Sequence, residues 1–283
     1  MLVLGCDAGL FALEKDFTPL PCPLRPVTHV ASLGKRLITV DDTHHLLWTG
    51  QRVIACDRGL TMLMMLRHHL LTLSGETDAL TLWNFDGHRL ISAHAGVYPT
   101  GMCPLADGLA VCGGAEGKLL LFSLPELHPA GSVAVPGICQ QVCPGGRGVY
   151  ILCLVGHEVP SCLLCRWVLR AQRYQPVAEL PGLPGALTPD GFGGCWAAAG
   201  EALYHFPAGK SSPDATVSGF GLIHHLTGDG QHLYCCDGLM DACYCVPTQP
   251  PYGPILLYRG AAGQTALMET DTKKDAPRKE VRP

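Results

Sequence analysis

Four cysteines lie within one short segment, where their thiols could bind a soft metal or take part in redox chemistry. They are Cys235, Cys236, Cys243 and Cys245. Alternate residues of a β-strand share a face, so Cys243 and Cys245 would lie together, with one of the earlier pair opposite. Structural zinc sites usually take paired ligands from turns, however, and this segment lacks that spacing. We therefore expect no bound metal or other cofactor, and keep a metal or redox site here as a subordinate hypothesis.

A second group combines imidazole, amide and hydroxyl side chains, which could bind a small polar ligand or transfer a proton. Its members are His29, Thr100, Gln140, Gln141, His224 and His225. Histidine has an ordinary pKa near neutrality, so a histidine beside a bound substrate can act as a general base. Because these residues are far apart in the chain, only a fold that repeats its elements around a common centre would bring them together.

The repeating element is clearest between Tyr98 and Gly137. Two short apolar runs, Leu109–Cys112 and Leu119–Phe122, lie between turn signals such as Asp107-Gly108. With flanking segments near Pro99 and Ser132, they predict four short antiparallel strands joined by turns rich in glycine and proline. No window of helical length shows an apolar period of 3.6 residues, so the sequence predicts an all-β fold.

The order of motifs in this unit resembles the YVTN-type, WD40-like repeat of bacterial and archaeal β-propellers. The matching features are Pro-Thr-Gly at 99–101, Asp-Gly at 107–108, the glycine-rich turn at 113–117 and Pro-Gly at 136–137. The resemblance implies a propeller scaffold and does not imply one particular activity.

The same rhythm recurs along the chain. The second strand of each unit is expected at Leu2–Cys6, Leu37–Asp41, Leu70–Ser74, Leu109–Gly113, Val149–Cys153, Phe192–Trp196 and Leu233–Asp237. The third strands are expected to end at Leu13, Trp48, Trp83, Phe122, Trp167, Phe206 and Val246. Spacings of this size and a recurring aromatic residue favour a propeller with seven four-stranded blades over a solenoid. A six-bladed ring with the first fragment outside it is the alternative.

The first unit lacks its innermost strand. The segment Gly263–Asp271 follows the last complete unit, and we expect it to pair into blade one and close the ring, because an open edge would leave backbone groups unpaired. The expected blades are 2–25 with 263–271, 26–59, 60–97, 98–137, 138–182, 183–221 and 222–260. Residues 1–271 would then form one domain, followed by a disordered polar tail at 272–283.

The innermost strands of a propeller line its central channel, and this is where the second group of residues falls. Aligning those strands on the turn that follows places His29, Thr100, Gln140 and His224 in one column, and Gln141 and His225 in the next. The alignment leaves open which column faces the channel. Either column could bind a small polar ligand or the end of a peptide, and a water-filled channel is the structural alternative.

Catalytic patterns are absent from the expected inner strands. Propeller lactonases and lyases hold a hard cation with carboxylates near the axis, and the inner strands of blades two to seven contain no Asp or Glu. Asp7, Asp41 and Asp237 are expected to cap turns. The leading hypothesis is therefore a non-catalytic binding or protein-interaction scaffold. The alternative is a propeller-type lactonase or lyase with His29, His224 or His225 as general base.

The composition of the chain limits the classes of partner and the cellular location that we expect. The net charge of −4 gives no reason to expect nucleic acid, and no apolar run reaches the roughly 20 residues that span a bilayer. No signal peptide is visible, so we expect a cytoplasmic protein whose 15 cysteines are mostly reduced and buried. Cys162 and Cys165 form a lone C-x-x-C that a strand would split between its two faces. The expected partner is an unidentified protein or a small polar ligand, without membrane insertion.

Overall fold

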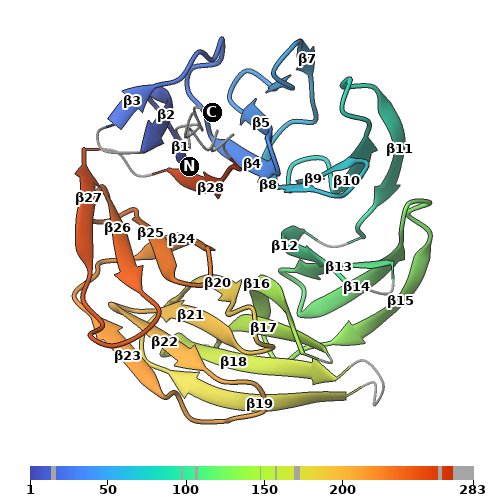
Figure 1. Ribbon diagram of the computed structural model, residues 1–283. Helices are drawn as coiled ribbons and strands as arrows, with labels where there is room; N and C mark the ends of the chain where they lie inside the picture. Colours follow the sequence, from blue (N-terminus) through green and yellow to red (C-terminus); the bar gives the residue numbers. More distant parts are fainter. Residues whose placement is uncertain are drawn as a thin grey trace, which may run out of the picture.

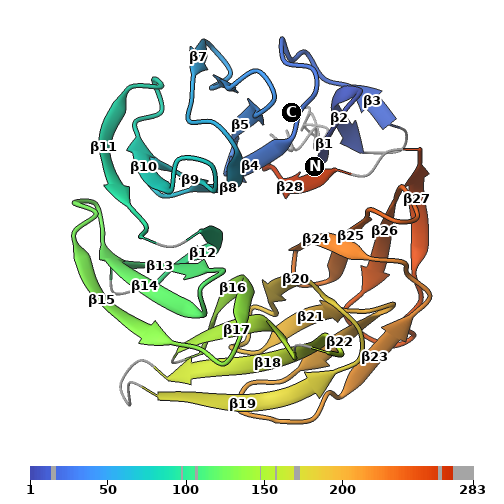
Figure 2. The ribbon, with the colours of Figure 1, turned by 180° about the vertical axis from the view of Figure 1, so that it is seen from behind.

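Seven four-stranded antiparallel sheets form a ring in the computed structural model (Figure 1). The structure describes residues 1–13, 17–96, 98–105, 108–146, 148–156, 158–168, 173–260 and 263–269, with the backbone alone at 109–112. The expected tail at 272–283, and the last two residues of the expected closing segment, lie outside these ranges. The view from behind shows the same closed ring (Figure 2). The prediction of a seven-bladed propeller is confirmed, and the six-bladed alternative is wrong.

Each blade runs from an inner strand beside the central opening to an outer strand at the rim. The inner strands, from blade one to blade seven, are β28 (Gln264–Leu267), β4 (His29–Leu33), β8 (Leu60–Met65), β12 (Pro99–Pro104), β16 (Ile138–Gly145), β20 (Pro184–Pro189) and β24 (Ile223–Gly228). The second strands are β1 (Leu2–Cys6), β5 (Arg36–Asp41), β9 (Leu70–Ser74), β13 (Leu109–Gly114), β17 (Gly148–Val155), β21 (Cys195–Ala199) and β25 (His232–Asp237).

The two remaining strands of each blade complete it outward. The third strands are β2 (Gly9–Leu13), β6 (Leu46–Trp48), β10 (Ala79–Trp83), β14 (Lys118–Ser123), β18 (Ser161–Val168), β22 (Ala202–Phe206) and β26 (Ala242–Pro247). The outer strands are β3 (Phe17–Pro19), β7 (Val53–Ala55), β11 (Arg89–His94), β15 (Pro129–Ala134), β19 (Arg173–Leu180), β23 (Ala215–Ser218) and β27 (Ile255–Arg259).

The ring is closed by strands from opposite ends of the described chain. β28 pairs antiparallel with β1, with Leu2 opposite Leu267 and Gly5 opposite Gln264. Every residue of β1 is buried, so this strand needs a partner on each side. The predicted closing strand is confirmed, and its structured part is β28.

Hydrophobic packing occurs between blades. The buried hydrophobic residues of the described chain form seven clusters, one for each pair of neighbouring blades. The predicted third-strand aromatics belong to these clusters: Trp83 packs with blade two, Trp167 with blade four and Phe206 with blade five. Because each sheet has a neighbour on both faces, strands such as β17 are apolar along most of their length.

One second strand lies elsewhere than predicted. Blade six was expected to have it at Phe192–Trp196, but β21 begins at Cys195. Asp190 accepts hydrogen bonds from the backbone N–H groups of Phe192 (2.7 Å) and Gly194 (2.8 Å), which fixes this segment as a turn. Phe192 is 86% exposed at its tip. An apolar residue in a glycine-rich turn therefore imitated the start of a strand.

The inner strands contain β-bulges, and these correct the predicted columns. Four of the extra residues are Thr61, Thr100, Gln140 and His224, and β20 has a similar register shift between Pro184 and Leu187. His29 pairs with Val40, which is the residue before the last one of β5. His225 pairs with Cys236, which is likewise the residue before the last one of β25. His29 therefore aligns with His225 and not with His224. A bulge adds one residue without changing the apolar pattern, so sequence periodicity does not reveal it.

Candidate functional site: the central cavity and its mouth

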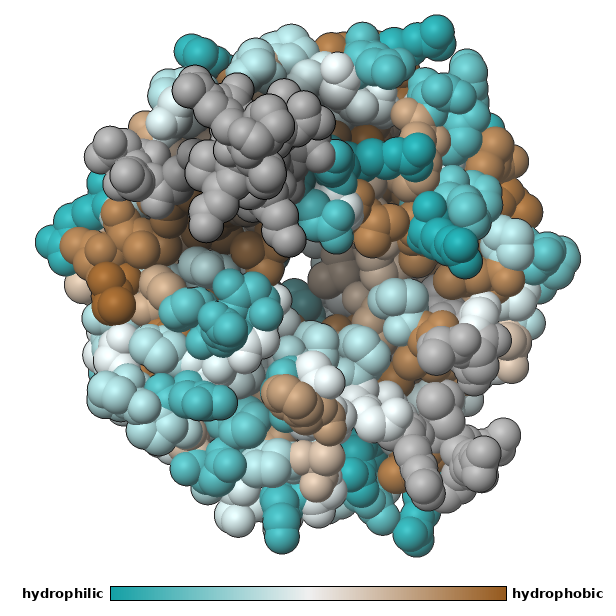
Figure 3. Space-filling view, in the orientation of Figure 1, coloured by the Kyte–Doolittle hydropathy of each residue, from teal (hydrophilic) through white to brown (hydrophobic). Residues whose placement is uncertain are grey.

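A cavity of about 430 Å³ lies at the centre of the ring, between the inner strands. The space-filling view shows the central opening that leads to it (Figure 3). Five of the seven inner strands contribute its amide, hydroxyl and imidazole side chains, which are Thr61, Gln141, Thr188, His224, His225 and Gln264. Hydrophobic residues such as Met62, Met102 and Leu226 form the rest of the wall. No described residue that lines the cavity carries a carboxylate, ammonium or guanidinium group.

The six predicted site residues are thus divided. Gln141, His224 and His225 line the cavity, whereas His29, Thr100 and Gln140 are not among its lining residues. His29 is buried, its Nδ1 lies 3.1 Å from the hydroxyl of Thr28, and burial lowers the pKa of its imidazole. Three lining residues were missed, namely Thr61, Thr188 and Gln264. Gln264 could have been found from the sequence, because it lies in the strand that was predicted to close the ring.

The bulge residues use their polar groups to join neighbouring blades. The hydroxyl of Thr61 donates to the carbonyl of Pro99 (3.4 Å), and that of Thr100 donates to the carbonyl of Cys139. His224 does the same in blade seven, where Nε2 lies 3.0 Å from the carbonyl of Gly263. Two of the predicted ligand residues, Thr100 and His224, therefore stabilise the ring through the same kind of contact.

His225 is held neutral and in a fixed orientation. Its Nε2–H donates to the carbonyl of Thr265 (2.9 Å), which also accepts from the hydroxyl of Thr227 (2.9 Å). Desolvation by the surrounding strands, with smaller contributions from the nearby His224 and His29, lowers the pKa of His225 to about 4. A carbonyl partner fixes the Nε2–H tautomer, which leaves Nδ1 as the acceptor. At neutral pH this side chain is a hydrogen-bonding group without charge.

Acid is expected to destabilise the fold through His225. Its pKa is about 4 in the folded chain and about 6.5 when unfolded, so the unfolded state binds the extra proton as the pH falls through this window. The free energy of unfolding should therefore fall between pH 7.5 and pH 5, by about 2 kcal/mol from this residue. Urea unfolding of the wild type and of His225→Gln at both pH values measures it. The variant should lose this part of the pH dependence, whereas substitution of the exposed His68 by Gln should not.

The cysteines of blade seven are not grouped in the way that a metal site requires. Among the described residues, no three His, Cys, Asp or Glu side chains are placed to hold a metal ion. Cys236 and Cys243 are opposite one another on β25 and β26, and both are buried. Its hydrogen bond to Cys236 and burial raise the pKa of the Cys243 thiol, and burial raises those of Cys235 and Cys245. The subordinate metal hypothesis therefore receives no support from the geometry.

Other thiols serve packing in the way the sequence predicted. Cys165 belongs to the cluster between blades four and five, and Cys162 to the cluster between blades five and six. Their C-x-x-C spacing is thus split between the two faces of β18.

Two of the three aspartates that were expected to cap turns accept backbone hydrogen bonds there. Asp41 accepts a hydrogen bond from the backbone N–H of His44 (3.1 Å). Asp237 is fully buried, and its carboxylate accepts four backbone N–H bonds of 2.6–3.1 Å. Two come from the loop between blades six and seven, and two from the turn between β25 and β26. Asp237 therefore joins two loops at the same end of the ring.

That end of the ring also has exposed hydrophobic side chains. We call it the entry face, because the inner strands begin there; the turns between second and third strands lie at the same end. Its exposed large apolar residues are Tyr98, Ile138, Val159, Leu183, Leu239 and Met240. They belong to the loops and strand ends of blades four to seven. Val159 and Leu239 are more than 70% exposed.

Comparison with known proteins adds no assignment. The seven blades agree with a WD40-like repeat fold. No protein-family model matches the chain, and no curated protein matches it. Among the described residues there is no apolar helix of the length that a bilayer requires. Any assignment of function therefore rests on the site itself.

Proposed function

We propose that this propeller is a non-catalytic binding scaffold that recognises a protein partner with its entry face and the mouth of its central cavity. The observation that carries the proposal is the set of exposed hydrophobic residues on the entry face of blades four to seven. Apolar side chains exposed at loops, next to polar groups, are typical of protein-interaction sites. The ring holds these loops rigidly, so the surface is ordered before a partner binds.

The chemistry of the cavity supports binding over catalysis. A lactonase or lyase needs a group that accepts a proton in the reaction, and usually a carboxylate-bound cation. The lining offers neutral amides, hydroxyls and imidazoles, and the Nε2–H of His225 is already bonded to a backbone carbonyl. Such a wall suits an uncharged polar group, for example a backbone or side-chain amide from the partner.

The proposal also assigns the protein to a repeat family and to a cellular location. Membership of the YVTN-type group is supported by the Pro-Thr-Gly, Asp-Gly and Pro-Gly motifs of blade four. A cytoplasmic location is supported by the many cysteines, because none of those that the structure describes forms a disulfide.

Site-specific photocrosslinking in cells would test the proposal. A photoreactive amino acid would replace Leu239 or Ile138 on the entry face, and Leu90 or Ile255 on outer strands as matched exposed controls. We expect a discrete crosslinked protein from the entry-face positions only. Equal crosslinking from all four positions would contradict the proposal, as would lactone hydrolysis by the purified protein that is lost in His225→Gln.

A further inference from the structure

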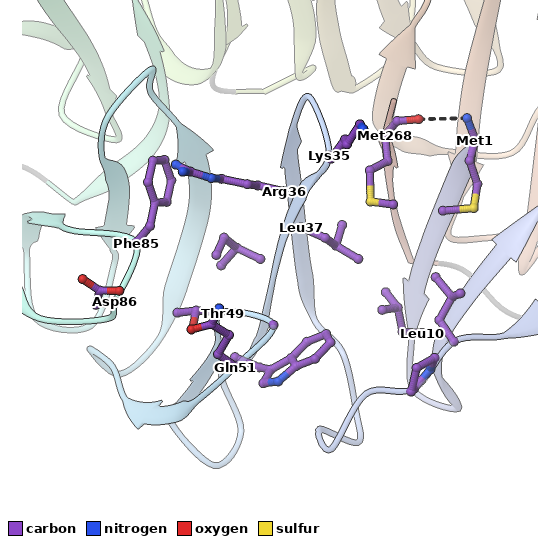
Figure 4. A pocket seen from close by; sticks show the side chains of 15 residues that line it. Met1, Leu10, Lys35, Arg36, Leu37, Thr49, Gln51, Phe85, Asp86 and Met268 are labelled. Atoms are coloured by element: carbon purple, nitrogen blue, oxygen red, sulfur yellow. Dashed lines mark hydrogen bonds between the residues drawn. The ribbon is translucent and has the colours of Figure 1, made fainter. Parts of the chain in front are cut away.

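A second and larger cavity lies away from the channel, in the groove formed by blades one, two and three (Figure 4). Its volume is about 500 Å³, within the range of small-molecule sites. The turn between β4 and β5 contributes Lys35, and the first residue of β5 is Arg36; the turns that follow β6 and β10 contribute Gln51 and Phe85. It shares no lining residue with the central cavity. A ligand bound here would therefore be independent of one in the channel.

The wall of this pocket is largely hydrophobic. Leu20, Leu37, Trp48 and Met268 pack against the core between blades one and two, yet each is only partly buried. Their remaining surface contributes to the pocket. Figure 4 shows that Leu37 and Arg36 extend to opposite sides of β5, with Arg36 directed toward Phe85. Removing this apolar surface from water would favour binding of an apolar group.

Cationic groups lie at the rim of the same pocket. The guanidinium of Arg36 lies 4.3 Å from the centre of the Phe85 ring. Arg36 is exposed and makes no ion pair with a carboxylate of the described residues, and Lys35 precedes it. Asp86, the one acidic residue among the described lining, lies apart from the guanidinium (Figure 4). Stacking on an aromatic ring restrains an arginine and leaves its N–H groups free to bind an anion.

We propose that this pocket binds a small amphipathic carboxylate that lies across the edge of blade two: its apolar chain or ring occupies the space beside Trp48 and Leu37, and its carboxylate bonds to Arg36 on the other side of that edge. Two observations support one occupant of this chemistry, namely an apolar wall of ligand size and the arginine Arg36 at its rim, in a protein whose net charge is −4. An arginine–carboxylate contact is directional and charge-assisted, so it would orient the ligand with its apolar part inward.

Methionine methyl NMR can test the site directly, because the methionines distinguish the two cavities. Met268 lines this pocket, whereas Met62, Met64 and Met102 line the central cavity. Decanoate is the probe, titrated below its micellar concentration, and decylammonium is the matched cation. Met268→Leu assigns its signal. We expect decanoate to shift the Met268 methyl saturably and to leave the three cavity methyls unchanged.

The charge of the rim is tested by Arg36→Gln, with Arg52→Gln as the control, since Arg52 is exposed in the same blade and does not line the pocket. Loss of a charge-assisted bond should weaken decanoate binding by about tenfold or more in Arg36→Gln and leave it unchanged in Arg52→Gln. Decylammonium should bind the wild type at least about tenfold more weakly than decanoate. Shifts confined to the central cavity, equal affinity for the two probes, or unaltered binding by Arg36→Gln would each overturn the proposal. None of these readouts depends on the entry face.

Discussion

A chain that ends at Gly260 is expected to lose its cooperative fold. The truncation removes β28, which is the inner strand of blade one and the only described partner of β1 on that edge. It leaves the fully buried β1 with unpaired backbone groups, and removes Ala266 from the cluster between blades one and two. It also removes the carbonyl groups of Gly263 and Thr265 that accept from His224 and His225. Such losses exceed the marginal stability of a typical domain, about 5–15 kcal/mol.

A chain that ends at Glu269 provides the matched control, because it keeps every described strand. Circular dichroism during heating should show a cooperative transition for this control and none for the shorter chain. Addition of a synthetic peptide of residues 263–269 should restore the transition in part, since an isolated strand can pair with an open edge. A cooperative transition within a few degrees of the control would show that β28 does not hold the ring closed.

Substitution of Asp237 by alanine is expected to cost about 3–4 kcal/mol of folding free energy. The carboxylate is fully buried and accepts from the backbone N–H groups of Gly221, Leu222, Leu239 and Met240. Alanine leaves these four donors without their acceptor, and two separate loops lose their common anchor. Urea unfolding at pH 7.5 measures the loss.

Asp237→Asn should have a smaller effect than the alanine variant, because its one carbonyl oxygen can still accept the bonds now made by Oδ1. Its amide NH2 group would however face the backbone N–H of Gly221, which is itself a donor and cannot accept a hydrogen bond. Asp86→Ala is the control, since this aspartate is exposed and should change stability by no more than about 0.5 kcal/mol. A loss of similar size in Asp237→Ala and Asp86→Ala would contradict the anchoring role.

The architecture could be predicted from the sequence because it depends on repeated features. Each blade has the same alternation of short apolar runs and glycine or proline turns, and the aromatic residues Trp48, Trp83 and Trp167 recur at one place. Closure of the ring followed from a single requirement, that β1 cannot be left with an open edge. Errors remained where the chain departs from the repeat, as at the apolar turn residue Phe192.

The site was less predictable, because it depends on single-residue displacements. Bulges at Thr100 and His224 shift the register of the inner strands by one position, and this decides which side chains line the cavity. Adjacent residues such as Gln140 and Gln141 have similar chemistry, so the sequence alone could not choose between them. The pocket beside Arg36 escaped prediction for a different reason: its wall is assembled from blades one, two and three, with few residues from each.

The pairing of β28 with β1 also determines when this protein can finish folding during its synthesis. The ribosome adds about 260 residues between β1 and its partner β28. At roughly 5–20 residues per second, the buried edge of β1 would wait about 13 to 52 seconds for its partner. Throughout that interval the newly made blades present an open strand edge, which is prone to pairing with other chains. Molecular chaperones that cover such edges would therefore be needed mostly while the polypeptide is still attached to the ribosome.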